Sequence, residues 1–340
     1  MDGRVVFLTG ATGFIGERVA HRLAADGWQL RCLVRSPSAP AARSLAALGA
    51  ELIPGDVVDD AALDRGLRGA TLAYHIAAVY DIGVVDEGRL ETTNVDGTRG
   101  FLRALERGGT PRAVYVSSTV ALGPVPPGEQ GDDQPPFAGP HPSIYHRTKT
   151  EAHRLALEAQ RRGLPLVIAC PAYVYGPGDK GPAGRLIEDL LRRRVPTLVS
   201  DPAWYSYVHV DDVADALAAL AVRGATTGVY VLGGENERFD RFVARITTLA
   251  GVFTPRPITP RAVARALGRV LDAITRRTGR RFAISVEGAN VASGAHYTFG
   301  HARARADLDF APRGLDEGLP GTVESFQAAR RGRRPRRAGP

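Results

Sequence analysis

Seven short apolar segments, separated by amphipathic helical patterns, constrain the fold of this chain more than any other feature. The segments are 5–8, 30–34, 51–53, 72–76, 113–117, 165–169 and 228–232. Helical patterns lie between them at 14–25, 41–48, 60–67, 86–107 and 143–161. Short strands that are apolar throughout belong to a parallel sheet covered by helices on both faces. The sequence therefore predicts an α/β fold built on a Rossmann-type, doubly wound parallel sheet.

Three stretches interrupt this alternation. Residues 124–142 are rich in Pro, Gly and Asp and are expected to form an active-site loop, the alternative being an ordinary surface loop. A helix at 186–194 precedes a strand at 207–210, and helical patterns dominate after 235. Such late segments commonly build a substrate lobe over the carboxyl ends of the sheet. We assign 1–175 and 206–233 to a nucleotide-binding domain, 176–205 and 234–329 to a smaller, mainly helical C-terminal substrate lobe, and 330–340 to a disordered Arg-rich tail.

Composition narrows the possible partners and location. Six arginines between 330 and 337 supply most of the net charge of +8, so charge alone indicates no specific nucleic-acid role. Cys32 and Cys170 lie far apart in apolar stretches, as expected of buried thiols in a reducing compartment. No signal peptide precedes the first strand and no apolar run is long enough to span a membrane, so a cytoplasmic location is expected.

A glycine turn follows the first apolar segment. Gly10 permits the tight turn, Gly13 lets the backbone approach a pyrophosphate, and Gly16 allows close packing of helix on strand. The N-terminus of the following helix would then face the anion. This pattern predicts a dinucleotide site, and the alternative is a glycine turn that binds no ligand.

The end of the second strand indicates which dinucleotide is bound. An acidic residue there would bind the ribose 2′-hydroxyl of NAD(H). This chain instead has Arg35 and Ser36, which can bind a 2′-phosphate through a guanidinium and a hydroxyl. The sequence predicts NADP(H), with NAD(H) as the alternative.

Only two of the 44 basic side chains are lysines, and one of them, Lys149, follows Tyr145 by four residues. On a helix the two side chains share a face. A nearby ammonium favours the phenolate, which makes a tyrosine usable as a general acid or base near neutral pH. The same ammonium can donate to a ribose hydroxyl. A surface Tyr/Lys pair without function is the alternative.

The glycine turn and the Tyr/Lys pair together resemble the extended branch of the short-chain dehydrogenase/reductase superfamily. Matching motifs lie at 9–16, 55–56, 75–78, 94–97, 117–118, 173–177 and 208–212. The resemblance implies that Tyr145 exchanges the substrate proton and that Lys149 depresses the Tyr145 pKa and holds the nicotinamide ribose. It also implies that Ser118 polarises the carbonyl, with Thr119 as the alternative hydroxyl.

The resemblance also distributes the cofactor among the remaining motif residues. Asp56 and Val57 are expected beside the adenine, Ala77 and Ala78 beside the pyrophosphate, and Tyr173 and Val174 beside the nicotinamide. Thr12, Phe14, Ile15 and Pro171 complete the expected cofactor site. Asn94 is expected to support the lysine through a helix distortion and water, or to make an ordinary hydrogen bond inside its helix. The chain departs from the family at Cys170, where relatives usually have arginine before the proline.

His209, Asp211 and Asp212 are the nearest approach to a metal motif. One imidazole and two adjacent carboxylates at a strand-to-helix boundary converge poorly, so no metal site is predicted. Asp211 or Asp212 is instead expected to cap the following helix.

Two classes of reaction occur in this branch. One class consists of sugar-nucleotide epimerases and dehydratases, which typically carry Arg-Asp where this chain has Tyr205 and Ser206. The other consists of reductases that resemble 3β-hydroxysteroid dehydrogenase and dihydroflavonol reductase. Trp204 and Tyr205 offer an aromatic surface for an apolar ketone, or form aromatic core beneath the lobe. We predict an NADP(H)-dependent oxidoreductase acting on a carbonyl or alcohol of a largely apolar small molecule. The alternatives are a nucleotide-sugar epimerase or dehydratase that keeps NAD bound and, from another class, a non-catalytic NADP-sensing protein.

An apolar stripe bordered by arginines marks the second lobe. It consists of Val263, Leu267, Val270, Leu271 and Ile274. Such a stripe can lie on an anionic membrane surface, but packing within its own domain is the expectation here. The family resemblance further implies a homodimer, for which the helices at 86–107 and 143–161 are the candidate interface.

Overall fold

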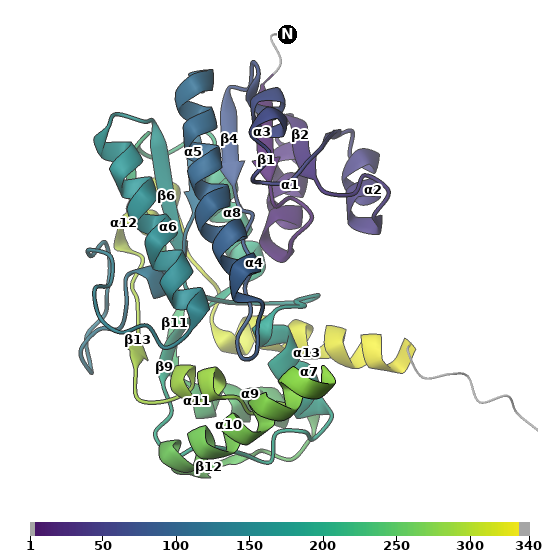
Figure 1. The fold of residues 1–340 in the computed structure, drawn as a ribbon, viewed down its shortest axis with the longest axis vertical. Coiled ribbons are helices and arrows are strands. Elements are labelled where there is room, and N and C mark those ends of the chain that lie inside the picture. Colours follow the sequence, from purple (N-terminus) through teal and green to yellow (C-terminus); the bar gives the residue numbers. More distant parts are fainter. Residues whose placement is uncertain (1–3, 333–340) are drawn as a thin grey trace, which may run out of the picture.

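A seven-stranded parallel sheet forms the larger part of the molecule (Figure 1), seen in a computed structural model that describes residues 4–332. In spatial order the strands are β3 (Glu51–Pro54), β2 (Gln29–Val34), β1 (Val5–Thr9), β4 (Leu72–His75), β5 (Ala113–Val116), β6 (Leu166–Pro171) and β10 (Gly228–Leu232). Each of the seven apolar segments has become one of these strands, and every neighbouring pair is parallel. The predicted doubly wound α/β fold is therefore confirmed.

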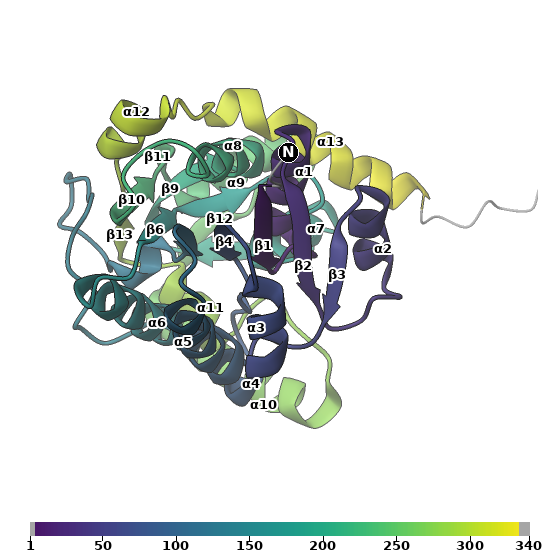
Figure 2. The ribbon, with the colours of Figure 1, turned by 90° about the horizontal axis from the view of Figure 1, so that it is seen from above.

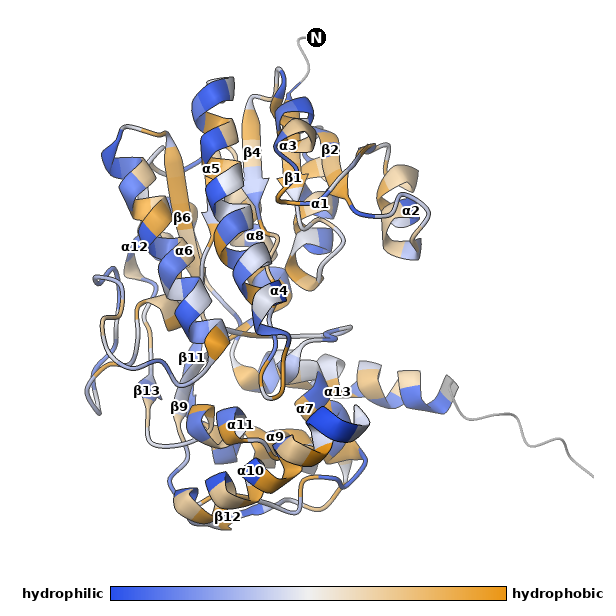
Figure 3. Ribbon diagram, in the orientation of Figure 1, coloured by the Kyte–Doolittle hydropathy of each residue, from blue (hydrophilic) through white to orange (hydrophobic). Residues whose placement is uncertain are grey.

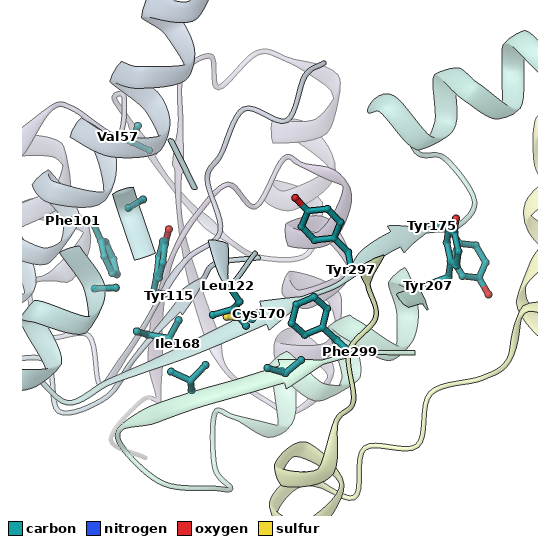
Figure 4. Close-up of a cluster of buried hydrophobic side chains, with 14 of the residues drawn as sticks. Val57, Phe101, Tyr115, Leu122, Ile168, Cys170, Tyr175, Tyr207, Tyr297 and Phe299 are labelled. Atoms are coloured by element: carbon teal, nitrogen blue, oxygen red, sulfur yellow. The ribbon is translucent and has the colours of Figure 1, made fainter. Parts of the chain in front are cut away.

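Helices cover both faces of this sheet (Figure 2). One face packs against α3 (Asp60–Leu67), α5 (Gly97–Gly108) and α6 (Ile144–Arg161), and the other against α1 (Phe14–Ala25), α2 (Pro40–Ala47) and α8 (Val210–Ala219). Successive residues of a strand point to opposite faces. Phe7 accordingly lies in one core, while Val6 and Leu8 lie in the other. The first core continues from Phe101 and Tyr115 toward Tyr297 and Phe299 (Figure 4).

The strand order reverses direction between β1 and β4. After β3 the chain returns to the far side of β1, so the turns that follow β1 and β4 lie next to each other at the carboxyl edge of the sheet. In open parallel sheets this switch point leaves a crevice in which ligands bind.

The smaller lobe combines helices with short strands. Its helices are α7 (Pro182–Leu191), α9 (Phe239–Ala250), α10 (Arg261–Thr278) and α11 (Val286–Val291). A second sheet contains β7 (Tyr173–Tyr175), β9 (Trp204–His209), β11 (Glu235–Arg238) and β13 (His296–Tyr297), and a third pairs β8 (Thr197–Val199) with β12 (Arg256–Thr259). The strand expected at 207–210 thus begins earlier, as β9, and belongs to the second sheet.

Two further helices end the described part of the chain, and the second of them contacts α7. After α12 (Ala302–Leu308), α13 runs from Leu315 to Gly332, and the Arg330 guanidinium donates to the Leu191 carbonyl at 2.6 Å. Arg330 and Arg331 are thus helical, contrary to the disorder expected from 330 onward. The rest of the expected tail, 333–340, lies outside the described residues.

The loop at 124–142 does not serve the role expected of it. Its backbone pairs with the C-terminal strand segment, Val125 donating to the His296 carbonyl and Gly131 to that of Thr298, each at 2.8 Å. None of its residues lines the cavity described below, so the prediction of an active-site loop was wrong and the surface-loop alternative holds.

Both cysteines are buried free thiols, as predicted. Between residues 4 and 332, no helix has the length and apolar character needed to cross a bilayer.

Candidate active site

The glycine turn after β1 is packed too closely to admit larger residues. Gly10 has a φ of +76°, and a Cβ there would lie 2.5 Å from the backbone nitrogen of Ala77 at the end of β4. A Cβ on Gly16 would lie 2.1 Å from the Gly10 carbonyl oxygen, whereas one on Gly13 would meet only that oxygen, at 3.2 Å. Gly13 is the N-cap of α1 and no side chain caps this helix end. The first amides of α1 are therefore available to an anion.

Gly16→Ala is expected to lower the free energy of unfolding by about 1–3 kcal/mol, because the new methyl meets fixed backbone. It should also weaken NADPH binding, since α1 must move away from the turn. Denaturant unfolding and a binding titration measure the two effects. Gly321→Ala is the matched control, because a Cβ there has nothing within 4 Å inside α13. It should be neutral or stabilise by up to about 1 kcal/mol. An unchanged Gly16→Ala protein would contradict the close packing.

One cavity of about 650 Å³ brings nearly all of the expected site residues together. Its lining includes Gly10, Thr12, Gly13, Phe14, Ile15, Gly16, Arg35, Asp56, Val57, Ala77, Ala78, Ser118, Thr119, Tyr145, Lys149, Pro171, Tyr173 and Val174. Ser36 is the exception: it is exposed, and its hydroxyl lies 3.2 Å from that of Ser38. The cavity thus runs from the end of β2 across the glycine turn to the start of α6.

Arg35 stands at the β2 end of this cavity. It is exposed at the end of β2, and no ion pair holds its guanidinium among residues 4–332. Arg31, four residues earlier and within β2, is by contrast paired with Glu51 at 2.8 Å. A free guanidinium at this position fits a phosphate group on the ribose.

Tyr145 and Lys149 lie one turn apart at the start of α6. Ser143 caps the helix, its hydroxyl accepting from the His146 amide at 3.3 Å. Ser118, at the end of β5, hydrogen bonds to the Tyr145 hydroxyl, and Thr119 follows it in the cavity wall. The end of β5 and the N-terminus of α6 therefore place a serine and a tyrosine hydroxyl where both can contact one ligand oxygen.

Burial controls the ionisation of both residues. It raises the pKa of Tyr145 to about 12, with the Ser118 hydrogen bond opposing the rise. It lowers the pKa of Lys149 to about 8. The Lys149 ammonium donates to the Val116 carbonyl at 3.0 Å and to the Tyr115 hydroxyl at 3.4 Å. The side chains alone therefore do not produce the expected lowering of the Tyr145 pKa, because desolvation outweighs the opposing hydrogen bond with Ser118.

Asn94 lies in the predicted helix distortion. The helix expected at 86–107 is divided into α4 (Glu87–Glu91), a π-helical turn (Thr92–Asp96) and α5. The Asn94 amide donates to the Val79 carbonyl and the Thr148 hydroxyl, both at 3.0 Å, and its carbonyl accepts from the Val79 amide at 2.7 Å. Asn94 thus joins the loop after β4 to the residue before Lys149, without a direct bond to Lys149 itself.

Four tyrosines of the cavity lining form an aromatic wall near Tyr145. We use this term for Tyr80, Tyr173, Tyr205 and Tyr297, which all line the cavity. The ring centroid of Tyr80 lies 4.5 Å from that of Tyr145, and those of Tyr205 and Tyr297 are stacked at 5.6 Å. Ile82 and Val291 add apolar surface beside them. The sequence did not single out Tyr80 or Tyr297. Tyr297 reaches the cavity because β13 pairs with β9, and the sequence around residue 297 does not indicate that pairing.

Trp204 does not share this wall. Its ring stacks on His296 at 6.0 Å, and only Tyr205 of the expected Trp204–Tyr205 surface reaches the cavity. The Tyr205 hydroxyl donates to the Val291 carbonyl at 2.6 Å, so this ring is tied to α11.

The predicted cap of α8 was wrong. His209 is the N-cap, its Nδ1 accepting from the Asp211 amide at 3.3 Å. Asp211 pairs with Arg18 at 3.0 Å and Asp212 with Arg313 at 2.8 Å. The N-cap lies two or three residues earlier than expected, which places both carboxylates in the first turn of α8, where arginines on other elements reach them.

Comparisons with known proteins agree with this fold and identify the family. The family described as "NAD dependent epimerase/dehydratase family" matches residues 6–233. The chain therefore belongs to the NAD-dependent epimerase/dehydratase family, the extended short-chain dehydrogenase/reductases. It is 29% identical over 330 residues to a protein of Synechocystis sp. named provisionally as a dihydroflavonol 4-reductase, with 94% of each chain covered. The resemblance drawn from the motifs is thereby confirmed.

Two further similarities bear on the reaction. A Stigmatella aurantiaca protein named 4-hydroxy-2-methyl-3-oxo-4-farnesyl-3,4-dihydroquinoline-1-oxide ketoreductase is 29% identical over 320 residues, covering 90% of this chain and 92% of its own. A solved structure described as a nucleoside-diphosphate-sugar epimerase from Pseudomonas aeruginosa superposes with a TM-score of 0.74 at 26% identity, covering 96% of this chain and 98% of that one. Both reaction classes considered above are thus present among proteins similar to this chain.

Proposed function

We propose that this chain is an NADP(H)-dependent carbonyl reductase, or in reverse an alcohol dehydrogenase, for a largely apolar small molecule that contains a ring. The aromatic wall beside Tyr145 carries the proposal. Its four rings, with Ile82 and Val291, make an apolar surface next to the two hydroxyls that would bind a carbonyl oxygen. Apolar walls with a few convergent polar groups are typical of sites for apolar ligands.

The protonation state of Tyr145 favours reduction. The dinucleotide, when bound, supplies the hydride. With a pKa raised to about 12, the Tyr145 hydroxyl is protonated at neutral pH and can give its proton to the carbonyl oxygen as negative charge develops there. Ser118 donates a second hydrogen bond to the same oxygen and stabilises that charge. Tyr145 is left as a phenolate, which regains a proton from solvent.

Lys149 and Arg35 would hold opposite ends of the dinucleotide. The Lys149 ammonium has one donor left after its bonds to Val116 and Tyr115, which suits a ribose hydroxyl. The unpaired Arg35 suits a 2′-phosphate.

The two relatives named as reductases support the substrate class. Their names specify reduction of a ring compound, a dihydroflavonol in the Synechocystis protein and a farnesylated quinoline oxide in the Stigmatella protein.

A thermal-shift titration tests this proposal against the sugar-nucleotide alternative. Ligands that bind only the native state raise its apparent stability. NADPH is expected to raise Tm more than NADH does, and added UDP or dTDP should cause no further rise. Preference for NADH together with a clear nucleotide shift would instead identify an epimerase or dehydratase.

Arg35→Ala is expected to weaken NADPH binding by about 10-fold or more, through loss of charge-assisted hydrogen bonds to the 2′-phosphate. NADH affinity should stay within about two-fold, because NADH has no such phosphate. Isothermal titration with each nucleotide measures both. Equal losses for the two nucleotides would show that Arg35 does not read the phosphate.

A further inference from the structure

Helix α10 presents its large apolar residues to solvent. Val263 is 54% exposed, Leu267 43%, Val270 58% and Ile274 39%, and we refer to these four residues as the α10 stripe. They are spaced by three or four residues, so they share one face of the helix. The expectation that this stripe packs within its own domain was therefore wrong.

The helix is attached to the lobe by a different, small-residue face. Ala264, Gly268 and Asp272 are its buried positions, and a Cβ on Gly268 would lie 2.7 Å from the backbone of Ser285. The Asp272 carboxylate accepts from the Val286 amide at 3.1 Å, which joins α10 to the start of α11. This close attachment fixes the orientation of α10 and leaves the stripe facing outward.

The surface around the stripe is strongly basic. Residues 256–281 contain eight arginines and one acid, the buried Asp272. Arg269, Arg276 and Arg277 are exposed, and none of these three has an ion-pair partner within the described part of the chain. Uncompensated arginines beside exposed apolar residues are complementary to a surface that is both anionic and apolar.

The stripe also lies at an outer edge of the molecule. In Figure 1, α10 lies in the lower part of the lobe, below the seven-stranded sheet, and Figure 2 shows it at the outer margin of the molecule beside α4; Figure 3 shows apolar residues along it. Ile258 on β12, which leads directly into α10, is 69% exposed and extends the apolar surface.

We propose that α10 docks the protein on the surface of a bilayer that contains anionic lipids. The α10 stripe and Ile258 would enter the boundary between headgroups and acyl chains, while the arginines bind lipid phosphates. Since no helix in the described range 4–332 can span a bilayer, this attachment is peripheral and reversible. The proposal does not depend on the reaction that the cavity catalyses.

Vesicle flotation tests the proposal directly. The full chain is expected to float with vesicles of equal parts phosphatidylcholine and phosphatidylglycerol and to stay behind with phosphatidylcholine alone. Raising the salt concentration should weaken the binding, because ions screen exposed charges. Val270→Glu should weaken the partition coefficient by about 10-fold or more, since it removes an inserted apolar group and adds a repelled charge.

Val222→Glu is the matched control. Val222 is 62% exposed and follows α8, so this variant makes the same substitution at similar exposure on the other domain. It should bind within about two-fold of the unmodified chain. Equal binding by Val270→Glu, or no flotation of the unmodified chain, would overturn the proposal. Self-association without lipid that Val270→Glu abolishes would also overturn it and assign the stripe to a second copy.

Discussion

Tyr145→Phe is expected to lower kcat by about 10²–10⁴-fold, the usual contribution of a positioned general acid. The substitution removes only the hydroxyl that Ser118 hydrogen bonds and leaves the ring against Tyr80. NADPH should still raise Tm, because the glycine turn and Arg35 are untouched. The measurement is NADPH consumption with an aromatic ketone that the unmodified protein reduces.

Tyr80→Phe is the control for Tyr145→Phe. It makes the same chemical change on the neighbouring ring and keeps the 4.5 Å ring contact. Its kcat should stay within a few-fold of the unmodified value, because no proton is transferred from Tyr80. Full activity of Tyr145→Phe would remove Tyr145 from the proposed acid role, and equal losses in both variants would show that the hydroxyls act only through packing.

Lys149→Arg is expected to lower kcat by at least about 100-fold, although it keeps the positive charge. Lys149 is 3% exposed, and its amine lies 5.1 Å from the centre of the Tyr115 ring. A guanidinium is larger and flat, so it should displace these neighbours and lower the free energy of unfolding by about 1–3 kcal/mol. Steady-state kinetics and denaturant unfolding provide the two readouts.

The dependence of activity on pH distinguishes the effect of the charge at residue 149 from the effect of the side chain's shape. The Lys149 amine, with a pKa lowered to about 8, is charged below that pH and neutral above it. Activity of the unmodified protein should therefore fall as pH rises through about 8. The residual activity of Lys149→Arg should lack this fall, because a guanidinium stays charged throughout.

Lys149→Met completes the comparison. It keeps an unbranched side chain without the buried charge, so the protein should stay as stable while losing activity. A Lys149→Met protein with unmodified kcat would show that the ammonium has no part in the reaction.

Local sequence predicted the strands well and indicated most of the residues that now line one cavity. A buried parallel strand is apolar throughout, so Leu72–His75 and Leu166–Pro171 are visible as short apolar runs. In this fold the chemistry lies just after strand ends, which is why Gly13, Ser118 and Ala77 could be placed together in advance.

Features that depend on long-range packing were not predictable in the same way. Periodicity revealed the α10 stripe but could not show which face α10 buries, because the close contact of Gly268 with Ser285 joins separate helices. The raised pKa of Tyr145 depends on how deeply other segments bury it. Tyr297 reaches the cavity only because β13 pairs with β9, about ninety residues earlier in the chain.

The π-helical turn at Thr92–Asp96 makes this helix irregular, and the contacts of Asn94 depend on that irregularity. A π turn holds one residue more than an α-helical turn, so deleting a single residue just before Asn94 would allow α4 and α5 to join as one uninterrupted α-helix. Such a deletion would leave α4 and α5 facing nearly as they do now, but it would remove the widened turn from which Asn94 reaches Val79 and Thr148. Deletions inside helices normally damage stability. At this turn a one-residue deletion would instead make the helix regular, while uncoupling the loop bearing Tyr80 from the helix bearing Lys149.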